Sequence, residues 1–305
     1  MRFVNVGEQH FYGLGQYGMP LDRLGTTRRL YNSHINHGAA GDISIPLLLS
    51  NTGYGLFFDN ARFALIDSGK SHNDICFEYE AEPGAFDLYF VGAKSLREAT
   101  IATTGLLGRP TMPPRWALGY MQSTRHFDSP EELAGLADEL RTRELPCDTI
   151  IFLSTYTDGK GWNTAVGTLD YEPAVLPDPQ AMFGKFRAQH FHYVSHEYPV
   201  VHMETALGME GAAKGYLLEG GYRDNRPVTH PSVQFFEGQR FIDFENTEAA
   251  DWWWRAHHQL FEDGVSAWWL DGGEGPTEPA ILGRPRGDGL HNRFDLFRQR
   301  AFARG

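Results

Sequence analysis

The sequence predicts two parts of different fold class, a β-rich part followed by an α/β part with a parallel sheet. Short apolar runs separated by turn residues fill the chain up to about residue 108. From Pro113-Pro114 onward, strand-like apolar runs alternate with amphipathic stretches of helix length. A chain of 305 residues is long enough for two domains that each bury a core. We therefore expect domains at 1–108 and 109–305.

In the first part, strand-like runs flank turn residues at two places, and each place predicts a hairpin. The runs and turns are, in chain order, Ile43–Leu49, Asn51-Thr52-Gly53 and Tyr54–Phe58, and then Ile75–Tyr79, Pro83-Gly84 and Phe86–Phe90. Ser95 followed by Glu98 is a capping box, which predicts a short helix that runs toward Gly105. Together these elements predict a β-sandwich or a portion of one.

The second part repeats a strand followed by a helix four times. The expected strands are Ala117–Met121, Thr149–Leu153, Phe191–Tyr198 and Val265–Leu270. The expected helices follow capping residues at Ser129, Asp178 and Asn246, the last of these closing at Gly264, and a fourth helix contains Leu290, Phe294, Phe297 and Ala301. Four βα units imply a parallel sheet, either part of a (β/α)8 barrel or a doubly wound sheet.

The charge balance excludes two classes of partner. The chain carries 27 Lys and Arg against 39 Asp and Glu, a net charge of −12. Nucleic-acid binders and proteins of anionic membrane surfaces need clustered basic residues instead. A content of 41% hydrophobic and 22% charged residues is typical of soluble globular proteins. We therefore expect neither a nucleic acid nor a membrane as partner.

Signals for cofactors and cellular location are sparse. Cys76 and Cys147 are too few for a disulfide scaffold and lack the spacing of a metal motif. No apolar run reaches the ~20 residues of a membrane-spanning helix, and the N-terminus lacks a signal-peptide core. If Met1 is the natural start, we expect a cytoplasmic protein. No phosphate-loop motif follows an expected strand, the sequence has no nucleophile-elbow motif, and we expect no cofactor.

A carboxylate lies at the carboxyl end of an expected strand, where parallel sheets bind their ligands. The last expected strand runs into Leu270-Asp271-Gly272-Gly273-Glu274, and ligands of parallel βα folds meet the carboxyl ends of the strands. Asp271 could attack or stabilise a positive centre there, and the glycines let a substrate approach the backbone. The alternative is that Asp271 only caps the loop.

Several motifs, in this order along the chain, resemble glycoside hydrolase family 31. They are Phe11–Gly15 and Tyr54–Asn60, similar to the family's β-sandwich domain, and then Pro113–Tyr120, Leu176–Pro179 and Trp268–Glu274. The family comprises retaining α-glucosidases, α-xylosidases and relatives. The resemblance implies a β-sandwich portion followed by the first four units of a (β/α)8 TIM barrel. It also implies hydrolysis of O-glycosyl bonds in an oligosaccharide or glycoside, through a covalent glycosyl-Asp intermediate.

The resemblance also suggests site residues. Asp271 falls on the nucleophile of the family's W-x-D-x-x-E segment, Glu274 on its second acid, and Trp269 on a wall of the sugar pocket. Typical α-glucosidases of the family end the second barrel strand with Asp residues that hold substrate hydroxyls. This chain has Leu153 and Thr155 there instead, so different residues must hold the hydroxyls. The candidates for substrate binding are Tyr156, Asp158, Trp162, Asn163, His196 and Arg125.

The family's acid/base Asp lies on a later strand, and no carboxylate of this chain matches it. We therefore expect a partial chain of a longer gene product, or a degenerate one, and its activity by itself stays open. A half-barrel would expose two unpaired sheet edges, which predicts self-association through them.

Two other functions remain open on the sequence alone. A non-catalytic carbohydrate-binding protein would bind sugar without turnover. A metal-dependent barrel hydrolase is less well supported, because His190 and His192 form an H-x-H pair near a strand without a convincing further series of ligands at strand ends.

Overall fold

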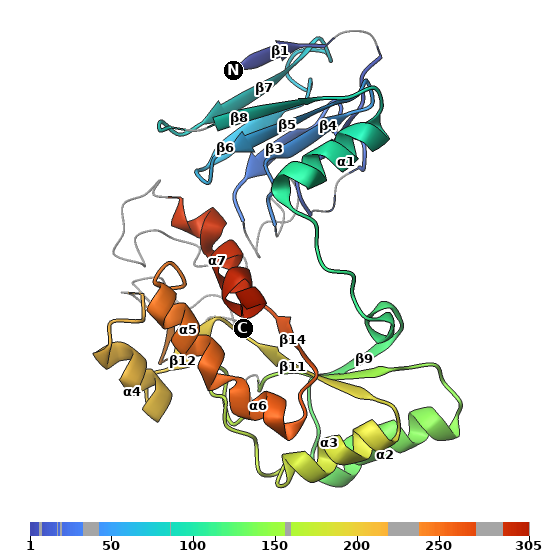
Figure 1. Ribbon diagram of the computed structural model, residues 1–305, viewed down its shortest axis with the longest axis vertical. Helices are drawn as coiled ribbons and strands as arrows, with labels where there is room; N and C mark the ends of the chain where they lie inside the picture. The colour runs from blue at the N-terminus through green and yellow to red at the C-terminus, as the bar shows by residue number, and fades with distance from the viewer. Residues whose placement is uncertain are drawn as a thin grey trace. The chain divides into compact units, whose positions relative to one another are not determined.

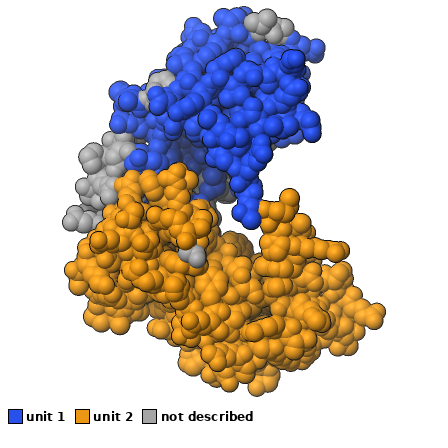
Figure 2. All heavy atoms as spheres, in the orientation of Figure 1, with its two compact units in different colours: residues 1–111, 274–280, 284–295 blue, residues 112–273, 281–283, 296–305 orange. Residues whose placement is uncertain are grey.

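The computed structural model describes residues 1–5, 8–16, 18, 20–32, 43–85, 87–155, 160–218, 238–272 and 289–304. The chain divides into two compact units, built mainly from Met1–Thr111 and from Met112–Gly273 (Figure 2). The last residues, Leu296–Gly305, belong to the second unit. We keep the domain boundary after residue 108 as a proposal.

The first unit is a sandwich of two four-stranded antiparallel sheets (Figure 1), as the sequence predicts. One sheet has the order β1 (Arg2–Val4), β7 (Cys76–Ala81), β6 (Ala64–Asp67) and β3 (Thr27–Leu30). The other has the order β2 (Phe11–Gly13), β4 (Leu47–Ser50), β5 (Tyr54–Asp59) and β8 (Asp87–Gly92). Both sheets supply the core, which includes Phe11, Leu48 and Phe58 on one side and Ile66 and Phe77 on the other.

One expected hairpin is correct and the other is wrong. β4 and β5 pair antiparallel across the turn, with Gly53 at φ 93°. The strands on either side of Pro83-Gly84 do not pair with each other, because β7 pairs with β1 and β6 whereas β8 pairs with β5. Turn residues reverse the chain whether or not the flanking strands share hydrogen bonds. This turn therefore carries the chain from one sheet of the sandwich to the other.

The expected capped helix forms and extends beyond Gly105. Helix α1 (Leu96–Leu107) starts at Ser95, whose hydroxyl accepts a hydrogen bond from the Glu98 amide at 3.2 Å. Gly108 follows the helix with φ 101°. The helix packs against β4, β5 and β8.

The second unit contains a four-stranded parallel sheet whose spatial order follows the chain. Its strands are β9 (Met121–Thr124), β10 (Thr149–Phe152), β11 (His192–Glu197) and β14 (Ala267–Leu270). A doubly wound sheet reverses its order at a switch point, whereas the strands of a (β/α)8 barrel stay in sequence. The observed order is that of the first four barrel strands.

The first strand of this sheet begins later than expected. Arg115–Leu118 forms the 3₁₀ helix η1, and the strand begins only at Met121. The 3₁₀ turn brings the Trp116 ring to 4.2 Å from the His192 ring, stacked at 16°. The strand expected at Ala117–Met121 therefore forms only from its last residue onward.

The expected helices are α2 (Pro130–Thr142), α3 (Pro179–Ala188), the pair α5 (Thr247–Ala256) and α6 (His258–Asp263), and α7 (Leu290–Arg304). The capping side chains of Ser129, Asp178 and Asn246 accept backbone N–H bonds as predicted. The helix expected from Asn246 to Gly264 is divided at His257. Its Nδ1 bonds to the carbonyl of Trp253 at 2.8 Å, which competes with the helical ladder.

The segment between β11 and α5 contains elements that sequence patterns did not predict. They are β12 (Val200–His202), helix α4 (Ala206–Ala213) and β13 (Gln239–Phe241), with β12 and β13 paired antiparallel. Strands and helices of three to eight residues are too short to show a clear period.

The core of the second unit lies on the helical face of the sheet. Ile150 and Phe152 of β10 pack there with Leu133, Phe183 and Leu260 from the helices. Figure 1 shows α2 and α3, which contact each other, on this face. Within the described residues, β9 and β14 each pair with one strand, and self-association through these edges stays a prediction.

Two sequence expectations about chemistry and location can be compared with the structure. Cys76 and Cys147 are free and buried. Among the helices in the described part of the chain, none has the length and apolar character needed to cross a bilayer.

Candidate active site

Asp271 lies at the carboxyl ends of two neighbouring parallel strands. The register aligns His196 of β11 with Trp269 of β14, so both strands end at the same level. Asp271 follows β14, and its amide donates to the Glu197 carbonyl at 3.0 Å. Its side chain keeps 31% of its surface exposed, so a ligand can reach the carboxylate.

The Asp271 carboxylate is held by donors on both oxygens. Oδ2 lies 2.8 Å from Nε2 of His196, and Oδ1 accepts the Gly272 amide at 2.8 Å. The Tyr198 side chain is a further hydrogen-bond partner. Each carboxylate oxygen has two lone pairs, so these contacts leave capacity for a reaction.

These contacts keep Asp271 ionised. Burial by itself would raise the pKa of this carboxyl, but the contact with His196 outweighs it, with the hydrogen bonds of Gly272 and Tyr198 adding to the effect. The pKa falls from 3.8 to about 2. Asp271 is therefore a carboxylate above about pH 4. Its contribution to stability is present above that pH and is lost as the pH falls toward 2.

Gly272 shapes the site, because it has a left-handed backbone at φ 67°. A Cβ on this residue would stand 2.7 Å from Cδ1 of Tyr198. We expect Gly272→Ala to lower the free energy of unfolding by about 1–2 kcal/mol, from backbone strain and displacement of the Tyr198 ring.

Denaturant unfolding measures the effect of Gly272→Ala, with Gly135→Ala as the matched control. Gly135 lies within α2 and has no atom within 4 Å of an added Cβ, so there alanine should stabilise the helix. Equal stability changes in the two variants would contradict the expectation.

His196 does not reach solvent, unlike a residue that binds substrate directly. It is 0% exposed. Ser154, just after β10, donates its amide to Nδ1 of His196 at 3.2 Å and its hydroxyl to the His196 carbonyl at 2.8 Å. In this arrangement Nε2 of the imidazole lies 2.8 Å from the Asp271 carboxylate.

Trp162 and Asn163 are also enclosed, at 0% and 1% exposure. The indole Nε1 of Trp162 donates to the His196 carbonyl at 2.6 Å. The Asn163 amide accepts from the Thr155 amide at 3.0 Å and donates to the Thr168 carbonyl at 2.8 Å. Their polar atoms therefore support the strand ends, and substrate contact by these two residues stays a prediction.

The remaining candidates are divided between exposed residues and residues outside the described ranges. Trp269 is 41% exposed with its ring 5.2 Å from that of His196, whereas Trp268 faces the helices and packs near Trp162. Strand alternation thus separates the two tryptophans as expected. Arg125 directly follows β9 and is exposed. Tyr156, Asp158 and Glu274 lie outside the described residues.

Sequence reasoning missed Arg298 of α7, which joins the two strand ends. Its fully buried guanidinium donates from Nη1 to the Asp271 carbonyl at 2.6 Å and lies 3.1 Å from Oε1 of Glu197. The signal was present in the sequence. Arg298 stands four residues after Phe294 and three before Ala301, on the apolar face of the helix. A charge in that position needs a buried partner.

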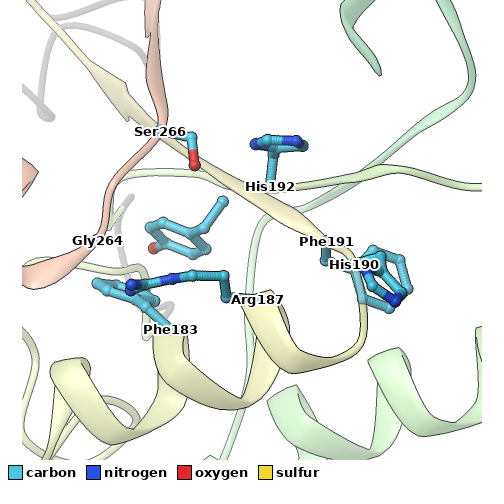
Figure 3. Close-up of a pocket in the computed structure, with 8 residues that line it drawn as sticks. Phe183, Arg187, His190, Phe191, His192, Gly264 and Ser266 are labelled. Atoms are coloured by element: carbon cyan, nitrogen blue, oxygen red, sulfur yellow. The ribbon is translucent and has the colours of Figure 1, made fainter.

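The metal alternative has little support in the geometry. His190 precedes β11 in a turn with φ 60°, so strand alternation does not align it with His192. Figure 3 shows the two rings apart, in a pocket of about 330 Å³ that also contains the Arg187 guanidinium. No group of three or more His, Cys, Asp or Glu gathers as a metal site within the described ranges.

Two family models match the chain. The glycosyl hydrolases family 31 TIM-barrel domain matches residues 110–305, and the glycosyl hydrolase 31 N-terminal galactose mutarotase-like domain matches residues 1–67. Alpha-glucosidase 2 of Bacillus thermoamyloliquefaciens is 27% identical over 290 residues, covering 90% of this chain and 34% of that enzyme. An alpha-xylosidase of Saccharolobus solfataricus is 25% identical over 268 residues, covering 87% of this chain and 32% of that enzyme.

Solved structures give the same result. A GH31 dextranase of Flavobacterium johnsoniae in complex with glucose matches with a TM-score of 0.82 and 26% identity, covering 98% of this chain and 37% of that one. A GH31 alpha-xylosidase from a soil metagenome, complexed with xylose, shares the fold with a TM-score of 0.76 at 21% identity, covering 99% and 44%. The chain spans about a third of the length of the curated relatives it matches.

Proposed function

The chain belongs to glycoside hydrolase family 31, and on that premise we propose that its site cleaves α-glycosidic bonds with retention, using Asp271 as the nucleophile. One observation carries the proposal. Asp271 is ionised, partly exposed and held by donors on both oxygens at the carboxyl end of β14. A carboxylate of this kind is what a glycosyl-enzyme intermediate requires.

In the proposed reaction, an Asp271 oxygen forms a bond to the anomeric carbon while the bond to the leaving oxygen breaks. The leaving oxygen takes the bonding electrons and a proton, and water later displaces Asp271 from the sugar. The mechanism needs a second carboxyl group about 5 Å away as acid and then base. Glu197 does not fit that role, since its side chain is 3% exposed and paired with Arg298, and we assign no other described residue to it.

The substrate class follows from the relatives' names. Relatives are named alpha-glucosidase, alpha-xylosidase and dextranase, and we infer an α-linked glucoside or xyloside for this site. The exposed ring of Trp269 lies on the same strand face as Asp271, two residues before it, and offers an apolar surface for the sugar. The expected inactivity of the chain by itself stays a prediction, since no carboxylate of the sequence matches the family's acid/base.

A labelling experiment tests the proposal without requiring a general acid. Fluoride leaves a sugar as an anion and needs no proton, so 5-fluoro-α-glucosyl fluoride and its xylosyl analogue should form one covalent adduct per chain. We expect peptide mapping by mass spectrometry to place the adduct on Asp271, and Asp271→Asn to abolish it. An adduct on another residue, or none at saturating probe, would contradict the assignment.

The second candidate function is sugar binding without turnover. It is favoured by the state of Glu197, which is tied to Arg298 and cannot serve as the acid. This function predicts binding of the uncleaved fluoride by calorimetry with no adduct, in the wild-type chain and in Asp271→Asn alike.

A further inference from the structure

The two ring nitrogens of His196 have opposite hydrogen-bonding roles. The Ser154 amide donates to Nδ1 at 3.2 Å, so Nδ1 has a lone pair and no proton. The ring is then neutral, and its proton is on Nε2, which faces Oδ2 of Asp271 at 2.8 Å. The contact is therefore an N–H donor directed at a carboxylate oxygen.

The structure also fixes the direction in which this N–H points. The His196 carbonyl accepts the Ser154 hydroxyl at 2.8 Å and the Trp162 indole N–H at 2.6 Å. The imidazole lies edge-on between the rings of Tyr198 and Trp269, at 4.9 Å and 5.2 Å. With 0% exposure, the ring has no solvent to turn into.

We infer that His196 is a positioning residue for Asp271, and that Ser154 acts through it by selecting the tautomer with the proton on Nε2. The inference rests on the proposed function, since it gives a reason to hold Asp271 in one orientation. The sequence predicts that residues after β10 hold substrate hydroxyls, whereas the inference gives them another role. Ser154 and Trp162 orient His196, and neither needs to contact a sugar hydroxyl.

A purely structural imidazole would fill the same space but predicts different chemistry. If His196 only packs, replacements of similar size should affect Asp271 equally. If it positions Asp271, the result depends on which nitrogen is replaced. Glutamine places an amide N–H near the position of Nε2, whereas asparagine places an oxygen near the position of Nδ1. The pair His196→Gln and His196→Asn therefore separates the donor from the acceptor.

The first measurement uses the wild-type chain. We expect ¹⁵N spectra of labelled histidine at neutral pH to show His196 as a neutral ring with its proton on Nε2. A proton on Nδ1, or a doubly protonated ring, would overturn the inference without any variant. The resonance is assigned by its loss in His196→Gln.

The second measurement titrates the ¹³C carboxyl of Asp271, assigned with Asp271→Asn. We expect His196→Gln to leave the pKa near its wild-type value and His196→Asn to raise it by about one unit or more, because the donor to the charged group is lost. Equal pKa values of Asp271 in the two variants would overturn the inference.

His126 provides a matched control, because it has the same contacts at the surface. Its Nδ1 accepts the Lys160 amide at 3.2 Å and its Nε2 lies 3.2 Å from Asp128, with a 44% exposed side chain. His126→Gln and His126→Asn should leave the Asp271 titration unchanged.

Fluoride labelling separates the two proposals. If the His196 variants titrate as expected but Asp271 is not labelled, the positioning role is supported and the nucleophile assignment is contradicted. If Asp271 is labelled but its pKa is equal in the two variants, the nucleophile assignment is supported and the positioning role is contradicted.

Discussion

Replacing Arg298 by methionine is expected to lower the free energy of unfolding by about 3–5 kcal/mol, because it removes the cation from a buried ion pair. Arg298 and Glu197 have side-chain exposures of 0% and 3%, and 3.1 Å separates their charged atoms. Methionine fills much of the volume but leaves the Glu197 carboxylate in a site built for a cation. Denaturant unfolding followed by far-UV circular dichroism measures the loss.

Two further variants show that charge, and not packing alone, causes this loss. Arg298→Met combined with Glu197→Gln removes both charges and should recover a large part of the stability. Arg304→Met is the matched control on the same helix, since Arg304 pairs with Asp251 at 3.8 Å with both side chains more than half exposed. It should cost about 1 kcal/mol or less. A loss in Arg298→Met no greater than in this control would contradict the argument.

His257 is expected to make the chain less stable as the pH falls from 6.5 to about 4, by up to about 3 kcal/mol. Burial is the largest cause that lowers the pKa of His257, and the positive charges of Arg298 and His258 add to it against the Trp253 hydrogen bond. The unfolded chain protonates this imidazole near pH 6.5, whereas the folded chain resists down to about 4. Protons therefore favour the unfolded state throughout this window.

Unfolding free energies measured from pH 8 to pH 4.5 test the sign and size of this dependence. His257→Phe removes the titrating group and keeps an aromatic ring among Trp253, Trp268 and Phe302. Its unfolding free energy should therefore fall less than that of wild type as the pH decreases. His258→Gln removes a positive charge that lowers the pKa of His257, so it should make the pH dependence slightly shallower than in wild type. A His257→Phe slope equal to that of wild type would contradict the prediction. Arg298→Met removes a positive charge that lowers the pKa of His257. This pKa should therefore rise, and the pH range over which stability is lost should become narrower.

The parts of the fold that sequence patterns predicted are those with strong local signals. Capping residues located the starts of α1, α2, α3 and α5. Each capping side chain accepts an amide hydrogen bond from a residue two or three positions later, so the signal is local in the sequence. The pairing of β7 and β8 could not be read locally. A proline and a glycine reverse the chain, but long-range burial decides which sheet accepts each strand.

The candidate site was predictable for Asp271, whose place follows from strand order and motif. The partners of His196 were not predictable, because they depend on how the residues after β10 fold back beneath β11. Trp162 and Asn163 follow that strand in sequence, as substrate-binding residues would, yet both are enclosed. Tyr198 was missed because no local sequence pattern places its side chain beside Asp271.

The link from Arg298 to the strand ends also sets an order of events during synthesis. Arg298 follows Glu197 by 101 residues and Asp271 by 27, so the ribosome makes both of its partners before Arg298 itself. Translation at about 5–20 residues per second separates Glu197 from Arg298 by roughly 5–20 seconds. Before Arg298 is made, the charged Glu197 side chain is more stable in water than buried without its ion-pair partner. The contacts of Arg298 with the carboxyl ends of β11 and β14 can therefore form only after α7 emerges from the ribosome.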